Sequence, residues 1–232
     1  MARRLFFVPQ VHRGIAELEG EDAKHLTRVL RVEPGQTYQL SDNESLYLAT
    51  VEEAHKSRVS FRVVEKSEAP EPKCRITLAA ALIKFDHFEW TIEKATELGV
   101  SRIVPVETVR SEAGLERAAA KRIERWRKIA LEASQQSRRA RLPEIADCVP
   151  FEAALRIEAD LRLFADEEGG APIHEAVVPA ASVVIAIGPE GGWTEAERAM
   201  AAGWTRVSLG PNVLRAETAA LAAMSVISSR LL

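Results

Sequence analysis

The apolar segment RITLAAALI, residues 75–83, constrains the fold of this chain more than any other feature of its sequence. After its first residue its only polar side chain is that of Thr77, so it has no face suited to water. Strands of this kind are typical of parallel sheets, which are buried on both faces. Such sheets need helices over each face, and the sequence after residue 83 alternates between helical and strand-like segments. We therefore expect an α/β domain with a mostly parallel sheet.

The other elements of this domain follow from the spacing of apolar residues. A helix is expected over residues 85–98 and a longer one from about 116 to 137. Two further helices are expected to begin at Thr194 and at about Ala216. The expected strands have the sequences RIVPV (102–106), LRLFA (161–165), SVVIAI (182–187) and TRVSL (205–209).

The first 70 residues have a different character and indicate a small β-barrel domain. The segments YQLSD, LYLATVEE and RVSFRVVEK are rich in β-branched and aromatic residues and are separated by turn-forming residues. One helix is expected over EDAKHLTRVLR, residues 21–31. The segment SEAPEPK contains two prolines and is the best candidate for a linker between this domain and the α/β domain. We place one domain at 1–70 and the second at 73–232.

Composition excludes several classes of protein. No apolar run approaches the roughly 20 residues that cross a bilayer, so we expect no membrane partner. The N-terminal sequence MARRLFFVPQVHRG lacks a long apolar stretch, and we expect no signal peptide. Cys74 and Cys148 are isolated from one another and from any His cluster, which predicts no metal site and fits a cytoplasmic protein.

Charge is distributed unevenly along the chain, although the formal net charge is only -3. The stretch 110–141 holds ten basic residues and four acidic ones. A local basic stripe of this kind can bind phosphates through release of counterions. A solvated helix face would have the same composition, so charge alone leaves both interpretations open.

Two glycine-containing loops directly follow buried strands, the position at which open parallel sheets bind ligands. The first is IGPEGGWT (187–194) and the second is LGPNVLRAET (209–218). Thr194 and Glu197 have the spacing of a capping box that opens a helix. Neither loop is a P-loop or a dinucleotide fingerprint, and both come late in the domain. Two tight turns without a ligand remain the alternative.

These loops carry a resemblance to a known family. IGPEGGWTEAE followed by LGPNVLRAETAALAAMSVI resembles the small-subunit ribosomal RNA uridine-N3 methyltransferases (RsmE type) of the SPOUT superfamily. The segments HLTRVLRVEPG, IEKATELGVSRIVPV and RWRKIALEASQQSRRARLPEI also match, in the order of that family. The resemblance covers nearly the whole chain.

The resemblance implies a PUA-like β-barrel followed by a SPOUT domain whose C-terminal segment forms a trefoil knot. It implies a homodimer that uses S-adenosyl-L-methionine as methyl donor and acts on 16S ribosomal RNA or the small ribosomal subunit. By position, the donor-binding role falls on Phe164, Ile187, Gly188, Gly192, Leu209, Gly210, Leu214 and Ala219.

Methylation of uridine N3 requires loss of a proton, and the resulting negative charge spreads onto O2 and O4 of the base. A guanidinium can donate two parallel hydrogen bonds to such oxygens. Arg215 and Arg139 are the catalytic candidates. Glu217 could act as a base, but we favour a role in orienting Arg215; a simple surface ion pair between the two is the alternative.

Contact with RNA is expected from basic and polar residues in both parts of the chain, namely Arg28, Arg31, Lys128, Gln136, Arg139 and Arg141. For the last three, capping of a helix end and a subunit contact remain open as alternatives. For Arg28 and Arg31, packing within the barrel is equally consistent with the sequence.

Three other functions compete with RNA methylation as interpretations of this sequence. A non-enzymatic RNA-binding factor would not need both loops intact, and a dinucleotide enzyme would carry its glycine loop after the first strand. A SPOUT enzyme that acts on transfer RNA is less consistent with the N-terminal barrel and the QQSRRAR segment. The sequence leaves open the target nucleotide, the choice between naked RNA and an assembled subunit, and the proton acceptor.

Overall fold

The computed structural model describes residues 4–232, which form two compact units. The first unit reaches to Glu71 and also includes Ser134–Leu142; the second contains Pro72–Ala133 and Pro143–Leu232. Residues 1–3 of the expected first domain lie outside the described residues. The chain therefore passes between the units three times. Within 4–232, no helix has both the length and the apolar character required to cross a bilayer.

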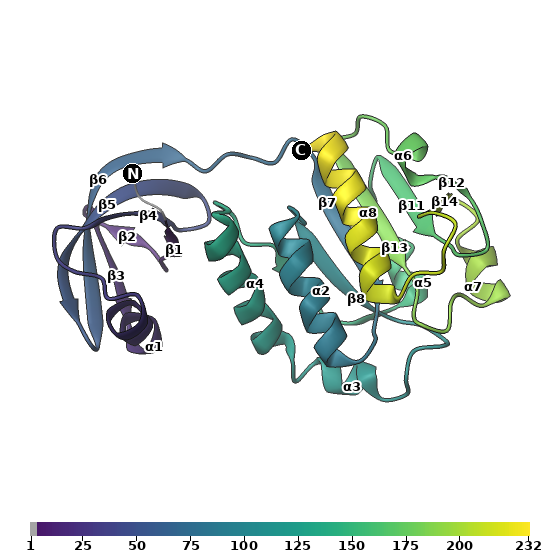
Figure 1. The fold of residues 1–232 in the computed structure, drawn as a ribbon, viewed down its shortest axis with the longest axis horizontal. Helices are drawn as coiled ribbons and strands as arrows, with labels where there is room; N and C mark the ends of the chain where they lie inside the picture. The colour runs from purple at the N-terminus through teal and green to yellow at the C-terminus, as the bar shows by residue number, and fades with distance from the viewer. Residues whose placement is uncertain (1–3) are drawn as a thin grey trace. The chain divides into compact units, whose positions relative to one another are not determined.

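The first unit is built on a six-stranded sheet that curls around its own core (Figure 1). The strand order is β1-β4-β5-β6-β3-β2, with β1 parallel to β4 and the other neighbours antiparallel. In β5, Tyr47, Ala49 and Val51 point alternately inward and are buried. The strands are β1 (Leu5–Phe7), β2 (Val11–His12), β3 (Ile15–Glu19), β4 (Thr37–Ser41), β5 (Ser45–His55) and β6 (Arg58–Glu68).

The single regular helix expected over 21–31 is wrong in detail. A short helix α1 (Gly20–Lys24) continues into one π-helical turn, η1 (His25–Val29). Ala23 and Leu26 are buried against the sheet, and Val32 N donates to Leu26 O at 3.1 Å. The wider turn therefore ends the helix before residue 31.

The segment Ser134–Leu142 is bonded to the first unit, which the sequence analysis did not anticipate. Ser41 Oγ donates to Ala140 O at 2.6 Å, and Leu142 N donates to the Asn43 side chain at 2.7 Å. Arg141 donates to the carbonyl oxygens of Asn43 and Ala69 at 3.1 and 3.2 Å. These bonds tie the segment to the β4–β5 turn and to the end of the linker.

The second unit contains a sheet in which every strand pair is parallel, as expected. Its order is β10-β8-β7-β13-β11-β14-β12, and β9 pairs with β8. The expected strands are all present, and three two-residue strands were missed. The strands are β7 (Arg75–Ala81), β8 (Arg102–Glu107), β9 (Glu144–Ile145), β10 (Val149–Pro150), β11 (Leu161–Ala165), β12 (Ala171–Pro172), β13 (Ser182–Ile187) and β14 (Thr205–Ser208).

Helices cover both faces of this sheet. The long helix expected over 116–137 is wrong, because Ala118 and Ala119 accept bonds from residues three positions later and the chain turns before α4 begins. The helices are α2 (Phe85–Glu97), α3 (Leu115–Ala119), α4 (Ile123–Ser137), α5 (Phe151–Ala154), α6 (Ile173–Ala176), α7 (Glu195–Met200) and α8 (Ala216–Leu231).

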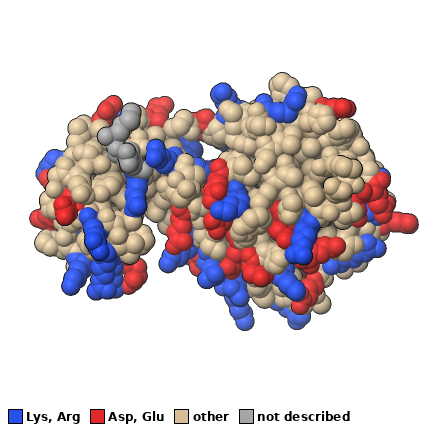
Figure 2. All heavy atoms as spheres, viewed as in Figure 1, with Lys and Arg blue, Asp and Glu red and all other residues tan. Residues whose placement is uncertain are grey.

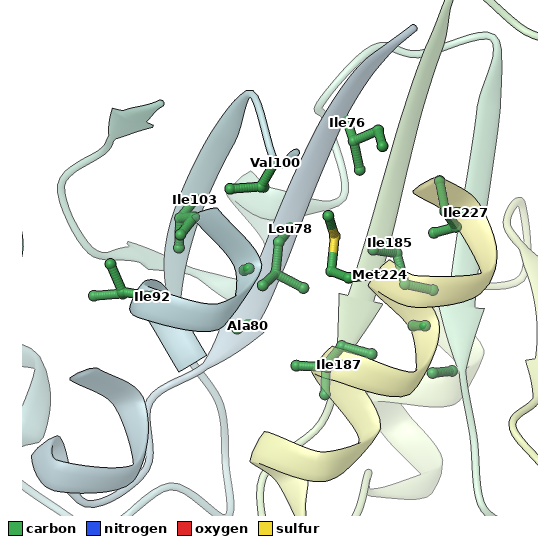
Figure 3. Packing of buried hydrophobic residues seen from close by; sticks show 14 of the residues in the cluster. Ile76, Leu78, Ala80, Ile92, Val100, Ile103, Ile185, Ile187, Met224 and Ile227 are labelled. Atoms are coloured by element: carbon green, nitrogen blue, oxygen red, sulfur yellow. The ribbon is translucent and has the colours of Figure 1, made fainter. Parts of the chain in front are cut away.

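Alternate residues of each strand enter different cores, which explains why the strands are apolar throughout. Leu78 points toward α2 and α8, where it belongs to the same cluster as Ile92 and Met224 (Figure 3). Its neighbour Ala79 belongs to a second cluster, on the other face, together with Trp204. The sheet is thus a rigid layer that fixes the positions of its loops.

Candidate methyl-donor site

A cleft opens at the carboxyl ends of β11, β13 and β14, three neighbouring strands of the parallel sheet. It encloses about 500 Å³, counting the space open to solvent at its mouth. This is within the range of sites for small organic ligands, and its position matches the ligand sites of open parallel sheets. Its lining residues are Ala165, Asp166, Glu167, Ile187, Gly188, Pro189, Ser208, Leu209, Gly210, Asn212, Leu214, Ala216 and Ala219.

Trp193 lies beneath the first glycine loop and sets its distance from β11. Its side chain is 1% exposed, and Nε1 donates to Ala165 O at 2.8 Å. The ring packs against Gly188 so closely that a Cβ at position 188 would lie 2.9 Å from it. A side chain at 188 would therefore push the loop away from the sheet and narrow the cleft.

The same loop is fixed from its far end by Glu197. The capping box expected between Thr194 and Glu197 is confirmed, with both reciprocal bonds present. The other oxygen of the buried Glu197 carboxylate accepts a bond from Val109 N at 2.9 Å. Next to it, Arg110 Nη1 donates to Gly191 O at 2.7 Å. The loop that follows β8 therefore holds the glycine loop in place.

Asp166 places a buried negative charge at the end of β11. Its side chain is fully shielded from solvent and contacts Arg198 Nε at 2.9 Å and Arg206 Nε at 2.8 Å. Burial alone would raise the pKa of Asp166, but the hydrogen bond from Arg198 and the two guanidinium charges hold that pKa below its usual value. Asp166 is therefore ionised and locked at the edge of the cleft.

The second loop leads into α8, whose N-cap is Arg215. The side chain of Arg215 is exposed and makes no hydrogen bond or ion pair among residues 4–232, although its carbonyl oxygen accepts from Ala219 N at 2.8 Å. No direct bond joins Glu217 to Arg215 in this part of the chain, and the expected role of Glu217 in orienting Arg215 stays a prediction. Glu217 instead bonds Nδ1 of His87, on the first turn of α2, at 2.9 Å. The guanidinium of Arg215 is thus free to meet another molecule.

Six of the eight residues expected to hold the donor line the cleft: Ile187, Gly188, Leu209, Gly210, Leu214 and Ala219. The Phe164 ring instead lies on the opposite face of the sheet, 4.7 Å from the ring of Trp193 between centroids. Gly192 lies behind the side chain of Glu167. Neither residue lines the cleft directly, and their expected role in donor binding stays a prediction.

Ala165, Asp166 and Glu167 also line the cleft, which we did not predict from the sequence. Ala165 ends the expected strand 161–165 and the other two residues follow it, at the position where open parallel sheets bind ligands. His87 had no such signal, because its partner is 130 residues away in the sequence. In residues 4–232, no group of three His, Cys, Asp or Glu side chains could hold a metal ion.

The residues expected to contact RNA belong to both units. Arg28 is exposed in η1, and Arg31 follows it with a φ of 52°. Lys128 and Gln136 are exposed along α4. Acidic and basic side chains are mixed on the face of the second unit seen in Figure 2.

Ion pairs account for much of this mixing. Arg122 and Arg125 both contact Glu89, at 3.3 and 2.7 Å, and Arg127 contacts Glu124 at 2.7 Å. Such arginines have less charge available for phosphate than their number in the sequence suggests. Lys128 has no ion-pair partner within residues 4–232 and remains available.

Arg139 and Arg141 lie beyond α4, in the segment that belongs to the first unit. Arg141 contacts Glu71 at 2.7 Å in addition to its bonds to backbone carbonyls. These bonds give Arg141 a structural role, and its expected contact with RNA stays a prediction. Burial lowers the pKa of Arg139 to about 10, so its guanidinium remains charged at neutral pH.

Comparison with known proteins agrees with this site. Residues 70–228 match a model described as an RNA methyltransferase domain, and residues 18–64 match an RNA methyltransferase PUA domain. The two matches, together with a parallel sheet that has a cleft at its carboxyl ends, place the chain in the class of RNA methyltransferases.

Individual relatives identify the family to which the chain belongs within this class. Ribosomal RNA small subunit methyltransferase E of Bacillus subtilis is 35% identical, with 91% of this chain and 88% of that protein aligned. Its counterpart from Synechocystis is 34% identical, with 100% and 78% aligned. The crystal structure of the Neisseria gonorrhoeae enzyme of that name, bound to S-adenosyl methionine, is 30% identical with a TM-score of 0.88 over 97% of each chain. The chain belongs to the ribosomal RNA small subunit methyltransferase E family.

Proposed function

We propose that this protein transfers the methyl group of S-adenosylmethionine to N3 of a specific uridine in 16S ribosomal RNA of the small subunit. The observation that carries the proposal is the cleft at the ends of β11, β13 and β14, which both glycine loops line. A non-enzymatic RNA-binding protein would have no need of this cleft. The relatives named above, which share this fold and the name of the family, support the choice of substrate.

The residues of the cleft fit the donor. Leu209, Leu214 and Ile187 offer apolar surface for a nucleoside, and the absence of side chains at Gly188 and Gly210 leaves backbone groups accessible. The carboxylate of Glu167 supplies a negative charge for a cationic ligand. We assign the donor to these residues together with Ala219, while Gly192 supports the site indirectly through Glu167.

S-adenosylmethionine supplies an electrophilic methyl group on a sulfonium. The chain must then align the base and stabilise the negative charge that develops on O2 and O4 as N3 loses its proton. We assign this role to Arg215, because its unpartnered guanidinium follows directly on Leu214, which lines the cleft. Arg139 is the second candidate.

We give Glu217 a positioning role rather than that of a base. Burial alone would raise the pKa of Glu217, but its hydrogen bond to His87 lowers that pKa below the usual value. A carboxylate with a lowered pKa is a poorer proton acceptor, which argues against its use as the base.

We propose that residues 1–70 form the RNA-binding domain and residues 73–232 the catalytic domain. Arg28, Arg31, Lys128, Gln136 and Arg139 are our candidates for RNA contact, and Arg141, whose guanidinium is bonded within the chain, is a lesser one. The first four are exposed, which supports their assignment.

We also propose that the C-terminal segment forms a trefoil knot and that the protein is a homodimer working in the cytoplasm, where ribosomal subunits are assembled. Insertion of the late strand β14 between β11 and β12 supports the knot. The small side chains of α8 would suit a packed helix surface in a dimer. A mass in solution of about twice 25.6 kDa is expected; a fully active monomer at micromolar concentration would contradict the dimer.

Mass-spectrometric mapping of modified uridines in 16S ribosomal RNA tests the proposed reaction. RNA from a deletion strain should lack one N3-methyluridine, and the purified protein with S-adenosylmethionine should restore it. Parallel reactions with naked RNA and with isolated small subunits identify the substrate form. An unchanged modification pattern in the deletion strain would contradict the proposal.

A further inference from the structure

His87 and Glu217 form a pair that joins the first turn of α2 to the first turn of α8. Nδ1 of His87 and Oε1 of Glu217 are 2.9 Å apart. Glu217 is only 7% exposed, and its second oxygen, Oε2, is buried without a hydrogen-bond partner among the described residues. A buried carboxylate of this kind is costly unless a cation compensates it, and His87 is the group in position to do so.

The neighbours of Glu217 in the sequence belong to the site. Ala216 lines the donor cleft, and Arg215 is the N-cap of α8. Because these residues share one helical turn, a displacement of Glu217 would move them as well. The α2–α8 contact is also an extensive one within the apolar core, so His87 is held on a rigid element (Figure 3).

We propose that His87 is a positioning residue: by pairing with Glu217 it fixes the first turn of α8, and so holds the cleft wall at Ala216 and the guanidinium of Arg215 in place. The part concerning Arg215 rests on the function proposed above. The part concerning the cleft depends only on donor binding.

This role makes donor binding dependent on pH. The charged groups that face His87 are Glu217 from α8, Asp86 from α2, whose carboxylate is 3.7 Å from Nε2, and Glu190 from the glycine loop. The hydrogen bond with Glu217 raises the pKa of His87 above its ordinary value of 6.5, and the other two acids act in the same direction. Arg215 lies near Glu217 and helps to lower the pKa of that carboxyl.

The direction of the effect follows from these shifts. The stabilisation that the protonated pair contributes is complete below about pH 6.5 and is lost as pH rises through the raised pKa of His87. In acid, the pair survives until pH falls through the lowered pKa of Glu217. Between these limits both partners are charged.

The test measures the affinity for S-adenosylhomocysteine, the unreactive product, by calorimetry as a function of pH. The wild-type affinity should fall as His87 loses its proton. His87→Gln should bind about tenfold more weakly below pH 6.5 and show no such fall, a loss that corresponds to about 1.4 kcal/mol. His87→Lys, which keeps a positive charge but titrates far higher, should retain affinity and show a flat profile. His174→Gln on α6, an exposed histidine away from the cleft, is the matched control and should behave as wild type.

A His87→Gln variant with the affinity and the pH profile of wild type would overturn the proposal. If that variant does not fold, His87→Lys decides: a wild-type pH dependence in this variant would overturn it equally. Single-turnover methylation of small-subunit RNA should also be slower in His87→Gln. Failure of the wild-type protein to methylate RNA, with the binding results as expected, would refute the proposed substrate and leave the role of His87 intact.

Discussion

The carboxylate of Glu167 occupies the space that a Cβ at position 192 would need, so a side chain on residue 192 would displace its Oε1. Gly192 also has a φ of 68°, a conformation that favours glycine. The absence of a side chain at Gly192 thus leaves the space in which the carboxylate of Glu167, a lining residue of the cleft, lies.

Replacement of Gly192 should therefore weaken donor binding through Glu167. We expect Gly192→Ala to lower the affinity for S-adenosylmethionine by about tenfold or more, and Gly192→Val to abolish binding while the protein remains folded. Gly203→Ala is the matched control, because its Cβ would meet no atom within 4 Å. Calorimetry measures the affinity. Unchanged binding by a folded Gly192→Val would show that donor binding does not depend on the space at this position.

Loss of the Trp193 indole N–H should destabilise the second unit. Trp193→Phe keeps most of the ring but leaves Ala165 O without its buried donor, which should cost about 1–3 kcal/mol in the free energy of unfolding. Trp90 is 44% exposed, so Trp90→Phe should change stability by less than about 0.5 kcal/mol. Urea unfolding compares the two, and equal stabilities would show that the bond to Ala165 contributes little.

Acid should reduce the contribution of Asp166 to the free energy of unfolding. Because its pKa is lowered in the folded protein, its stabilisation is present above the ordinary value of 3.8 and is lost as pH falls through the lowered pKa. Asp166→Asn should be less stable than wild type at neutral pH, and the difference should shrink in acid. Unfolding midpoints from about pH 7 to about pH 3 test this. Parallel curves for the two proteins would contradict the lowered pKa.

Arg215 should contribute to the rate of methyl transfer more than to binding. Arg215→Ala is expected to lower the single-turnover rate by roughly 100-fold or more, the usual scale for loss of one such donor. Arg215→Lys should recover little, because an ammonium cannot donate two parallel bonds. Rates at saturating RNA and donor provide the measurement. A near wild-type rate for Arg215→Ala would transfer the proposed role to Arg139.

Substitution of Arg141 should lower the stability of the protein, whereas substitution of Lys128 should weaken RNA binding. Arg141→Ala removes bonds to two carbonyls and to Glu71, and should destabilise the first unit by about 1.5–3 kcal/mol. Lys128→Ala should leave stability unchanged but weaken RNA binding and reduce its salt dependence. Chemical unfolding and binding at several salt concentrations separate the two. A loss of RNA affinity in a fully stable Arg141→Ala would support its expected contact with RNA.

The parallel sheet could be predicted because its long strands are apolar on both faces, so that Leu78 and Ala79 enter different cores. The strands β9, β10 and β12 contain two residues each, too few for a periodic pattern, and form because neighbouring strands place them there. The π-helical turn depends on tertiary packing around Leu26, which composition does not reveal.

Only the parts of the site that consist of residues adjacent in the sequence could be predicted. Glycines and apolar residues after a strand indicate a ligand loop, and both such loops line the cleft. Pairing at long range leaves no such mark: Glu217 was expected to contact Arg215, two residues away, but bonds to His87. For the same reason, nothing in the sequence indicates that Arg141 bonds to Asn43, Ala69 and Glu71.

The contribution of Ser134–Leu142 to the first unit also sets an order of events during synthesis. Ser41 bonds to Ala140 and Asn43 to Leu142, in each case a partner made 99 residues later. At roughly 5–20 residues per second, a ribosome needs roughly 5–20 s to add that length of chain. The first unit therefore cannot be completed when Glu71 has been made, because its last bonds form only after the end of α4 has been synthesised together with much of the second unit.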